Sequence, residues 1–146
     1  MLEKEDAHTS RHKGEVLTAK KAHLETKSRT DSILQQDPGI RYVAITDYSN
    51  TTIECKGQGT FQLPLETFRS FVSIGPLLAL SAMACKIESS CGRLGYLVGR
   101  FEKALVAIYQ LHYLMVVVAV DSTYPLQRLE EFASFLKRME KREWKV

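Results

Sequence analysis

Residues 94–121 read LGYLVGRFEKALVAIYQLHYLMVVVAVD, and this stretch decides the fold of the chain. Leu94–Glu102, Lys103–Leu111 and Tyr113–Asp121 are rich in the β-branched and aromatic residues that favour strands. The breaks between them are short, and strands joined by tight turns run antiparallel. The stretch therefore predicts three consecutive strands of a mostly antiparallel sheet.

Two further strands are expected nearer the N-terminus. Ile40–Asp47 carries bulky residues on both of its faces, which is typical of an inner strand. The sequence Tyr48-Ser49-Asn50-Thr51 predicts a turn after it. Thr52–Lys56 then predicts the second strand of a β-hairpin, which Gly57-Gln58-Gly59 ends.

Three helices are expected around these strands. Glu15–Asp37 is compatible with a surface helix, and Asp37-Pro38-Gly39 ends it. Leu65–Ser90 has apolar residues at helical spacing, although Pro76 predicts a kink or a restart. A last helix is expected after Pro125, which fits a first turn. Its apolar stripe consists of Leu126, Leu129, Phe132 or Ala133, Leu136 and Met139.

The length and composition agree with one domain. The chain has 146 residues, of which 45% are hydrophobic and 25% are charged, as in an ordinary globular protein. Residues 1–14 are polar and without periodicity, so we expect a flexible tail followed by a single domain at 15–146. The order α-β-β-α-β-β-β-α predicts an α/β (α+β) sandwich with a five-stranded, mostly antiparallel sheet.

Charge and hydropathy exclude several classes of protein. The net charge of +3 is too small to predict binding of nucleic acid. Phe71–Ile87 and Ala104–Val120 are apolar but shorter than the roughly 20 residues of a membrane span, so we expect no membrane insertion. Because the N-terminus lacks a secretory signal and the cysteines are odd in number, we expect a cytoplasmic protein.

Residue types that carry catalysis or bind metals do not form a recognised motif. Ser73 or Ser81, with His112 and Asp121, include the residue types of a catalytic triad, but no G-x-S-x-G sequence positions a serine. Cys85 and Cys91 lack the spacing of a zinc knuckle. We therefore expect no catalytic residue, no metal and no cofactor.

The helix expected at Leu65–Ser90 is apolar over most of its circumference. The part after Pro76 is dense in small residues, which allow another backbone to approach closely. A domain of this size has difficulty covering such a helix on every side. We therefore expect a second copy of the chain to supply part of the cover.

Several segments resemble the roadblock (dynein light chain roadblock) family. Residues 38–54, PGIRYVAITDYSNTTIE, resemble its opening hairpin, in which a short strand ends in Asp before a turn. Residues 79–102, ALSAMACKIESSCGRLGYLVGRFE, resemble its central helix and the strand that follows, especially as found in stand-alone archaeal members. Residues 113–121, YLMVVVAVD, resemble its last strand, and the helix after Pro125 resembles its closing helix.

The resemblance implies a fold, a quaternary structure and a class of partner. Family members form homodimers or family heterodimers through edge-to-edge pairing of the middle strand and packing of the central helices. Members commonly act as platforms or regulators for small Ras-like GTPases, and no catalytic residue comes with the family. We therefore expect a non-enzymatic, homodimeric scaffold that binds a small GTPase. The interface residues implied are Phe68, Val72, Leu78, Ala79, Ala82, Leu94, Tyr96, Val98 and Arg100.

A small-ligand sensory domain of similar topology is the alternative. Such a domain needs a pocket between the sheet and the helices, and Tyr42, Tyr96 and Tyr109 are the residues expected to line one. Arg69 and Arg93 lie, like Arg100, on elements expected near the dimer face. Ordinary surface arginines are the favoured interpretation, because an arginine finger needs a placement that sequence does not show.

Overall fold

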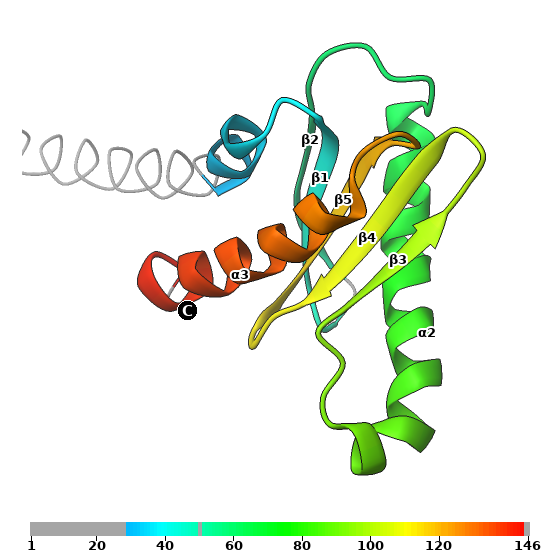
Figure 1. Ribbon diagram of the computed structural model, residues 1–146, viewed down its shortest axis with the longest axis vertical. Coiled ribbons are helices and arrows are strands. Elements are labelled where there is room, and N and C mark those ends of the chain that lie inside the picture. Colours follow the sequence, from blue (N-terminus) through cyan, green and yellow to red (C-terminus); the bar gives the residue numbers. More distant parts are fainter. Residues whose placement is uncertain (1–28, 50, 145–146) are drawn as a thin grey trace, which may run out of the picture.

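The fold is a three-layer α+β sandwich around one antiparallel sheet (Figure 1). The computed structural model describes residues 29–49 and 51–144. Neighbouring strands pair antiparallel in the order β2-β1-β5-β4-β3, so the predicted fold class is confirmed. The strands are β1 (Ile40–Asp47), β2 (Thr52–Gly57), β3 (Tyr96–Arg100), β4 (Ala104–Gln110) and β5 (Leu114–Asp121).

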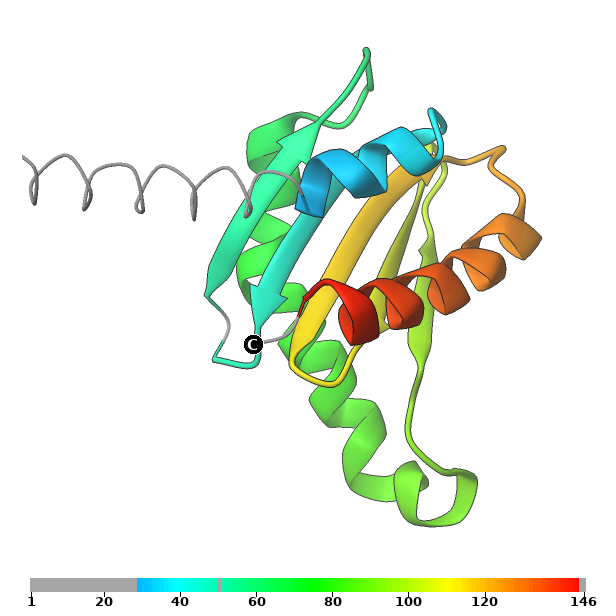
Figure 2. The ribbon, with the colours of Figure 1, turned by 90° about the vertical axis from the view of Figure 1, so that its left-hand side faces the viewer.

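Helices cover both faces of the sheet (Figures 1 and 2). α2 (Leu65–Cys91) lies on one face, whereas the helical residues 29–36 and α3 (Leu126–Arg142) lie on the other. Each face has its own hydrophobic core, and the sheet separates the two cores. The sequence prediction of helices packed on a five-stranded sheet therefore holds in three dimensions.

The central strands agree closely with their sequence patterns. β1 lies between β2 and β5, as its bulk on both faces predicts. β5 is the middle strand of the sheet, and its residues from Leu114 to Val120 are all buried. The apolar run Ala104–Val120 forms β4 and most of β5, two strands joined by a turn. Within the described residues, no helix combines the length and apolarity needed to cross a membrane.

Some expectations from the sequence are wrong, and one lies outside the described residues. The restart expected at Pro76 does not occur, because α2 is continuous from Leu65 to Cys91. Pro76 loses one helical hydrogen bond, but its ring is buried and the turn before it is held on the sheet by fully buried Val72. Leu126, expected in the core stripe of the last helix, is 52% exposed. The expected tail at 1–14 lies outside the described residues.

Side-chain hydrogen bonds attach the helical residues 29–36 to β2 and its neighbours. Thr30 donates to Glu54, and Lys56 forms a salt bridge with Asp31. Nε2 of Gln58 donates to the carbonyl oxygens of Leu34 at 3.0 Å, of residue 37 at 3.3 Å and of residue 40 at 2.8 Å. These contacts hold the N-terminal helical segment beside the strand that ends the sheet.

Candidate functional site

One edge of the sheet is available for pairing at β3. β3 pairs with β4 from Tyr96 opposite Tyr109 to Arg100 opposite Leu105. Among the described residues, no strand pairs with its other side. An unpaired edge presents backbone N–H and C=O groups that can bind another strand. The resemblance to the roadblock family implies an interface at this strand and places the interface strand in the middle of the sheet. That position is wrong, because β5 is the middle strand and β3 lies at an edge. Within the described residues, this edge is unpaired.

The predicted interface residues around β3 lie at or near the surface. Leu94, Tyr96 and Val98 are half-buried. Tyr96 and Val98 pack against the core on the α3 face, whereas Leu94 packs against the core on the α2 face. Arg100 is exposed, and its Nη1 donates weakly to the carbonyl oxygen of Ser122 at 3.4 Å. These side chains remain partly accessible to a partner.

The predicted interface residues on α2 divide into two groups. Phe68 and Val72 are only 1% and 0% exposed because they pack against the sheet of their own chain. These two residues fix α2 on the sheet and offer no surface to a partner. Ala79 is half-buried against the same core. The side chains of Leu78 and Ala82 lie outside the described ones, so their role in an interface stays a prediction.

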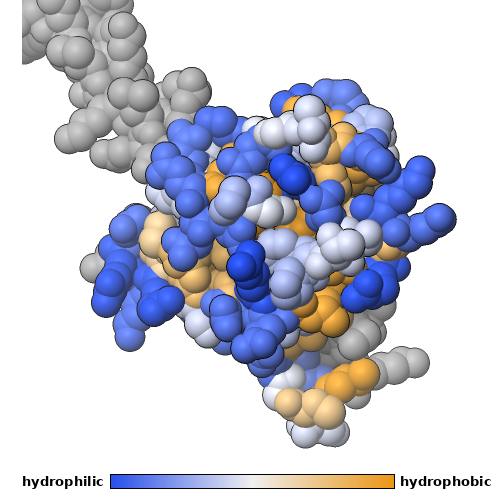
Figure 3. Space-filling model, turned by 45° about the horizontal axis from the view of Figure 1, so that its top comes forward, coloured by the Kyte–Doolittle hydropathy of each residue, from blue (hydrophilic) through white to orange (hydrophobic). Residues whose placement is uncertain are grey.

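α2 also carries apolar side chains that its own chain leaves exposed. Ile74 is 61% exposed and Ile87 is 44% exposed. The C-terminal part of α2 extends past the strands instead of lying over them (Figure 1). By contrast, the end of the molecule seen in Figure 3 is covered largely by hydrophilic residues. The exposed apolar surface of α2 is the surface that the sequence pattern predicts to need a cover.

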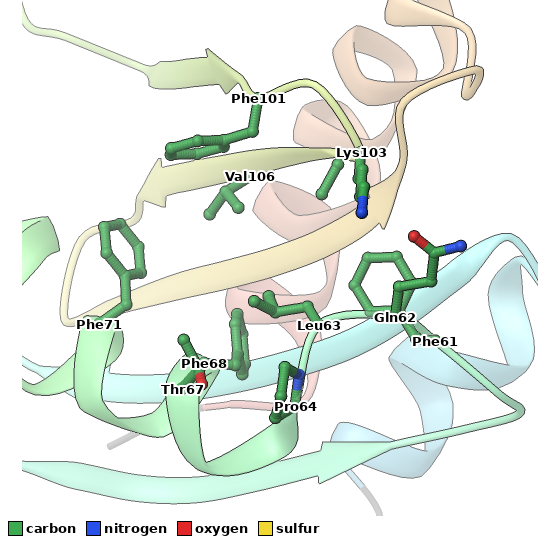
Figure 4. A pocket seen from close by; sticks show the side chains of 11 residues that line it. Phe61, Gln62, Leu63, Pro64, Thr67, Phe68, Phe71, Phe101, Lys103 and Val106 are labelled. Atoms are coloured by element: carbon green, nitrogen blue, oxygen red, sulfur yellow. The ribbon is translucent and has the colours of Figure 1, made fainter.

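An apolar groove of about 390 Å³ opens beside the N-terminal half of α2 (Figure 4). One wall comes from the segment before α2 and from its first turns, and the other comes from the β3–β4 connection and the start of β4. Phe101 is 56% exposed in this groove, whereas Val106 is 7% exposed. The lining residues are Phe61, Gln62, Leu63, Pro64, Thr67, Phe68, Phe71, Phe101, Lys103, Ala104 and Val106.

The groove continues into a polar depression at one end. Phe61, Gln62 and Lys103 line both the groove and this depression, which has a volume of about 710 Å³. The remaining residues of the depression are polar or charged: Thr60, Glu102, Asp121, Ser122 and Thr123. The groove therefore has an apolar body and one polar end, where the Lys103 ammonium group lies next to a depression that also holds the carboxyl groups of Glu102 and Asp121.

The tyrosine pocket expected from the sequence does not form. Tyr42 belongs to the α2 face, where its hydroxyl donates to the carbonyl oxygen of Leu63 at 2.5 Å. Tyr96 and Tyr109 stack at 5.4 Å between ring centroids on the α3 face. The Tyr109 hydroxyl donates to the carbonyl oxygen of Leu129 at 2.7 Å. The three tyrosines lie on opposite faces of the sheet and cannot line one pocket.

The sequence does not predict the groove itself. Its walls come from residues 61–68, Phe71 and residues 101–106, which no local motif connects. The available signal was the placement of large apolar residues, Phe61 and Leu63, in a loop where polar residues are the norm. Phe101, directly before the polar pair Glu102-Lys103, was a second signal of this kind.

The arginines near the predicted interface are engaged within the chain. Nη1 of Arg69 forms a salt bridge with Glu66 at 3.0 Å, and Nη2 of Arg93 donates to the carbonyl oxygen of Leu111 at 3.0 Å. Arg69 also contacts Cys55, whose thiol pKa is raised by burial. In the described part of the chain, no three His, Cys, Asp or Glu side chains gather to hold a metal ion.

Several solved structures have the same fold. A Roadblock/LC7 domain from Streptomyces avermitilis has a TM-score of 0.58 at 12% identity, covering 76% of this chain and 90% of that domain. The gliding protein MglB from Thermus thermophilus has a TM-score of 0.56 at 18% identity, covering 80% and 89%. An MglB structure with a tetrameric arrangement has a TM-score of 0.56 at 17% identity, covering 81% and 89%.

No protein-family model and no curated protein sequence matches the chain. At the identities of the solved structures, the likeness shows the fold alone. The chain therefore has the roadblock fold, which confirms, at the level of the fold, the resemblance to the roadblock family that its sequence carries.

Proposed function

We propose that the chain is a cytoplasmic, non-enzymatic scaffold that forms homodimers and binds or regulates a small Ras-like GTPase. One observation supports the dimer above all. Within the described residues, the chain combines an unpaired strand edge at β3 with exposed apolar side chains on α2, those of Ile74 and Ile87. Pairing of two β3 edges would satisfy backbone groups and would bring two α2 helices together.

The GTPase partner rests on the resemblance to the roadblock family. Nucleotide would bind the GTPase and not this chain. The chain would act through surface complementarity, with the paired α2 helices as a partly apolar platform. An MglB structure has a tetrameric arrangement, so assembly of several chains is compatible with this fold.

Oligomeric state is the first test of this proposal. Size-exclusion chromatography with light scattering is expected to give the mass of a dimer at micromolar concentration. Ala82→Glu would place a charge in the interface and is expected to give the monomer mass with unchanged circular dichroism. Leu126→Glu is the control, because Leu126 is exposed on α3 at the other face of the sheet. A wild-type monomer would contradict the dimer.

The partner is tested by capture of nucleotide-loaded GTPases. Small Ras-like GTPases from the same genome, loaded with GDP or with a non-hydrolysable GTP analogue, are passed over the immobilised protein. Preferential retention of one loaded form is expected, with the Ala82→Glu variant showing weaker retention. Retention of neither form, while the wild-type protein is dimeric, would contradict the GTPase partner and leave the dimer intact.

A further inference from the structure

We propose that the groove beside α2 binds a single-chain anionic amphiphile, specifically a free medium-chain fatty acid whose carboxylate lies at Lys103. This site is distinct in kind from the scaffold function, because it takes a small molecule and not a protein. Figure 4 shows the Lys103 ammonium at the groove end formed by Phe61 and Gln62, with Phe71 toward the other end.

The body of the groove fits a hydrocarbon chain. Four phenylalanines line it, together with Leu63, Pro64 and Val106. Phe101 keeps 56% of its surface exposed there, so a bound chain would remove apolar area from water. A large exposed aromatic side chain in a concave apolar site indicates a surface that a ligand covers.

The size of the groove selects the class of hydrocarbon. Its volume of about 390 Å³ lies near the lower end of small-molecule sites, which run from roughly 300 to 1,000 Å³. One medium-length acyl chain is suited to such a groove, and a two-chain lipid is too large. The lining includes one hydroxyl group, that of Thr67, which is exposed on α2. The floor of the groove, at Val106, is apolar.

The charge at the polar end selects the head group. Lys103 is exposed, and within the described residues no salt bridge includes its ammonium group. Lys103 is the charged residue in the lining of the groove itself, whereas the carboxylates of Glu102 and Asp121 line only the adjoining depression. Asp121 is already paired with Arg41 at 3.2 Å. A carboxylate at this end would form a charge-assisted hydrogen bond with Lys103, and the Gln62 amide offers a second donor.

Titration calorimetry of the full-length, delipidated protein with laurate below its micellar concentration tests the site. We expect saturable binding of one laurate per chain. Lys103→Glu is expected to weaken binding about tenfold or more, because a charge-assisted bond is replaced by repulsion. Lys141→Glu, an exposed charge reversal on α3 at the other face of the sheet, is the matched control and is expected to leave binding unchanged.

A second pair of measurements separates the chain from the head group. Phe101→Ala removes an exposed wall residue, which keeps the fold, and is expected to weaken laurate binding about fivefold. Dodecyltrimethylammonium has the same chain length and a cationic head. It is expected to bind the wild type more weakly than laurate does, and to bind the Lys103→Glu variant at least as tightly as laurate does.

Defined results would overturn the proposal. Absence of saturable laurate binding would do so, as would equal weakening by the Lys103 and Lys141 variants. Binding of laurate by the monomeric Ala82→Glu variant but not by the wild-type dimer would mean that a second copy of the chain covers the groove. The groove would then be part of the interface, and the proposed ligand site would be wrong. Light scattering and GTPase capture on the same samples judge the scaffold function separately.

Discussion

At the scale of single residues, contacts between neighbouring strands limit which side chains the sheet accepts. Gly57 lies opposite Tyr42 in the β1–β2 pair. A Cβ atom at Gly57 would lie 2.5 Å from the ring of Tyr42. That ring is confined, because its hydroxyl donates a hydrogen bond to the carbonyl oxygen of Leu63 and the rings of Phe61 and Phe68 lie at centroid distances of 5.2 and 5.3 Å.

Gly57→Ala is therefore expected to destabilise the protein by about 1–3 kcal/mol, the usual cost of overpacking. The control is Gly95→Ala, since a Cβ atom there meets nothing within 4 Å. It is expected to change stability by less than about 0.5 kcal/mol. Urea unfolding followed by circular dichroism measures both variants. Equal stability of the two variants would contradict the packing described around Tyr42.

The two ends of α3 provide a second comparison between residues of one type. Leu136 is 0% exposed and Leu126 is 52% exposed, although both belong to the apolar stripe seen in the sequence. Leu136→Ala is expected to cost about 2–5 kcal/mol, because it leaves a cavity in the core. Leu126→Ala is expected to cost less than about 0.5 kcal/mol. Chemical denaturation checks the pair, and comparable losses would show that both ends of the stripe are buried.

At the scale of elements, periodicity predicts strands and helices well because it follows from burial. β1 and β5 carry apolar residues on both faces, and both are inner strands. Pro76 shows the limit of a local rule: packing against β1 and β2 holds α2 together where the proline alone predicts a restart.

Which face a strand residue occupies depends on register, and sequence alone does not fix the register between distant strands. Tyr42 is opposite Ala119, and Ala119 is opposite Val106, so these three residues share the α2 face. Tyr109 lies an odd number of residues after Val106 and therefore points to the α3 face. The expected tyrosine pocket failed for this reason.

Among the contacts that attach the helical residues 29–36 to β2, the one between Thr30 and Glu54 involves a partly buried carboxyl group. Burial raises the pKa of Glu54 above its usual value, and Asp31 acts in the same direction, while the Thr30 hydrogen bond, Lys56 and Arg29 oppose the rise. One Glu54 carboxylate oxygen is buried without a hydrogen-bond partner.

A raised pKa means that the folded state binds this proton more tightly than the unfolded state. Stability therefore falls as the pH rises from the unfolded pKa, near 4.5, through the higher folded pKa. Glu54→Gln keeps an acceptor for Thr30 and removes this loss. We expect the variant to be more stable than wild type at pH 7 and to lose this advantage below about pH 4. Urea unfolding across pH measures it, with the exposed Glu130→Gln as control.

At the scale of the whole molecule, the sequence predicts that a single chain leaves apolar surface uncovered. It does not predict the position of every such surface. The need for a cover over α2 follows from composition, and Ile74 and Ile87 are indeed exposed. No local pattern in the sequence predicts the groove beside α2, because its walls at Phe61, Phe71 and Phe101 meet only when the sheet brings distant segments together. Such a site depends on topology, which has no local signature.

If two chains complete each other, folding and association are linked, and the thermal midpoint depends on concentration. A hundredfold increase in protein concentration stabilises a folded dimer by about 2.7 kcal/mol, which raises the midpoint by several degrees. The fluorescence of Trp144 reports the transition, because this side chain is 1% exposed in the core on the α3 face. The Ala82→Glu monomer is expected to unfold at a lower temperature that concentration does not change. A wild-type midpoint independent of concentration would show that one chain is sufficient for the fold, and would remove the physical basis for the paired α2 platform.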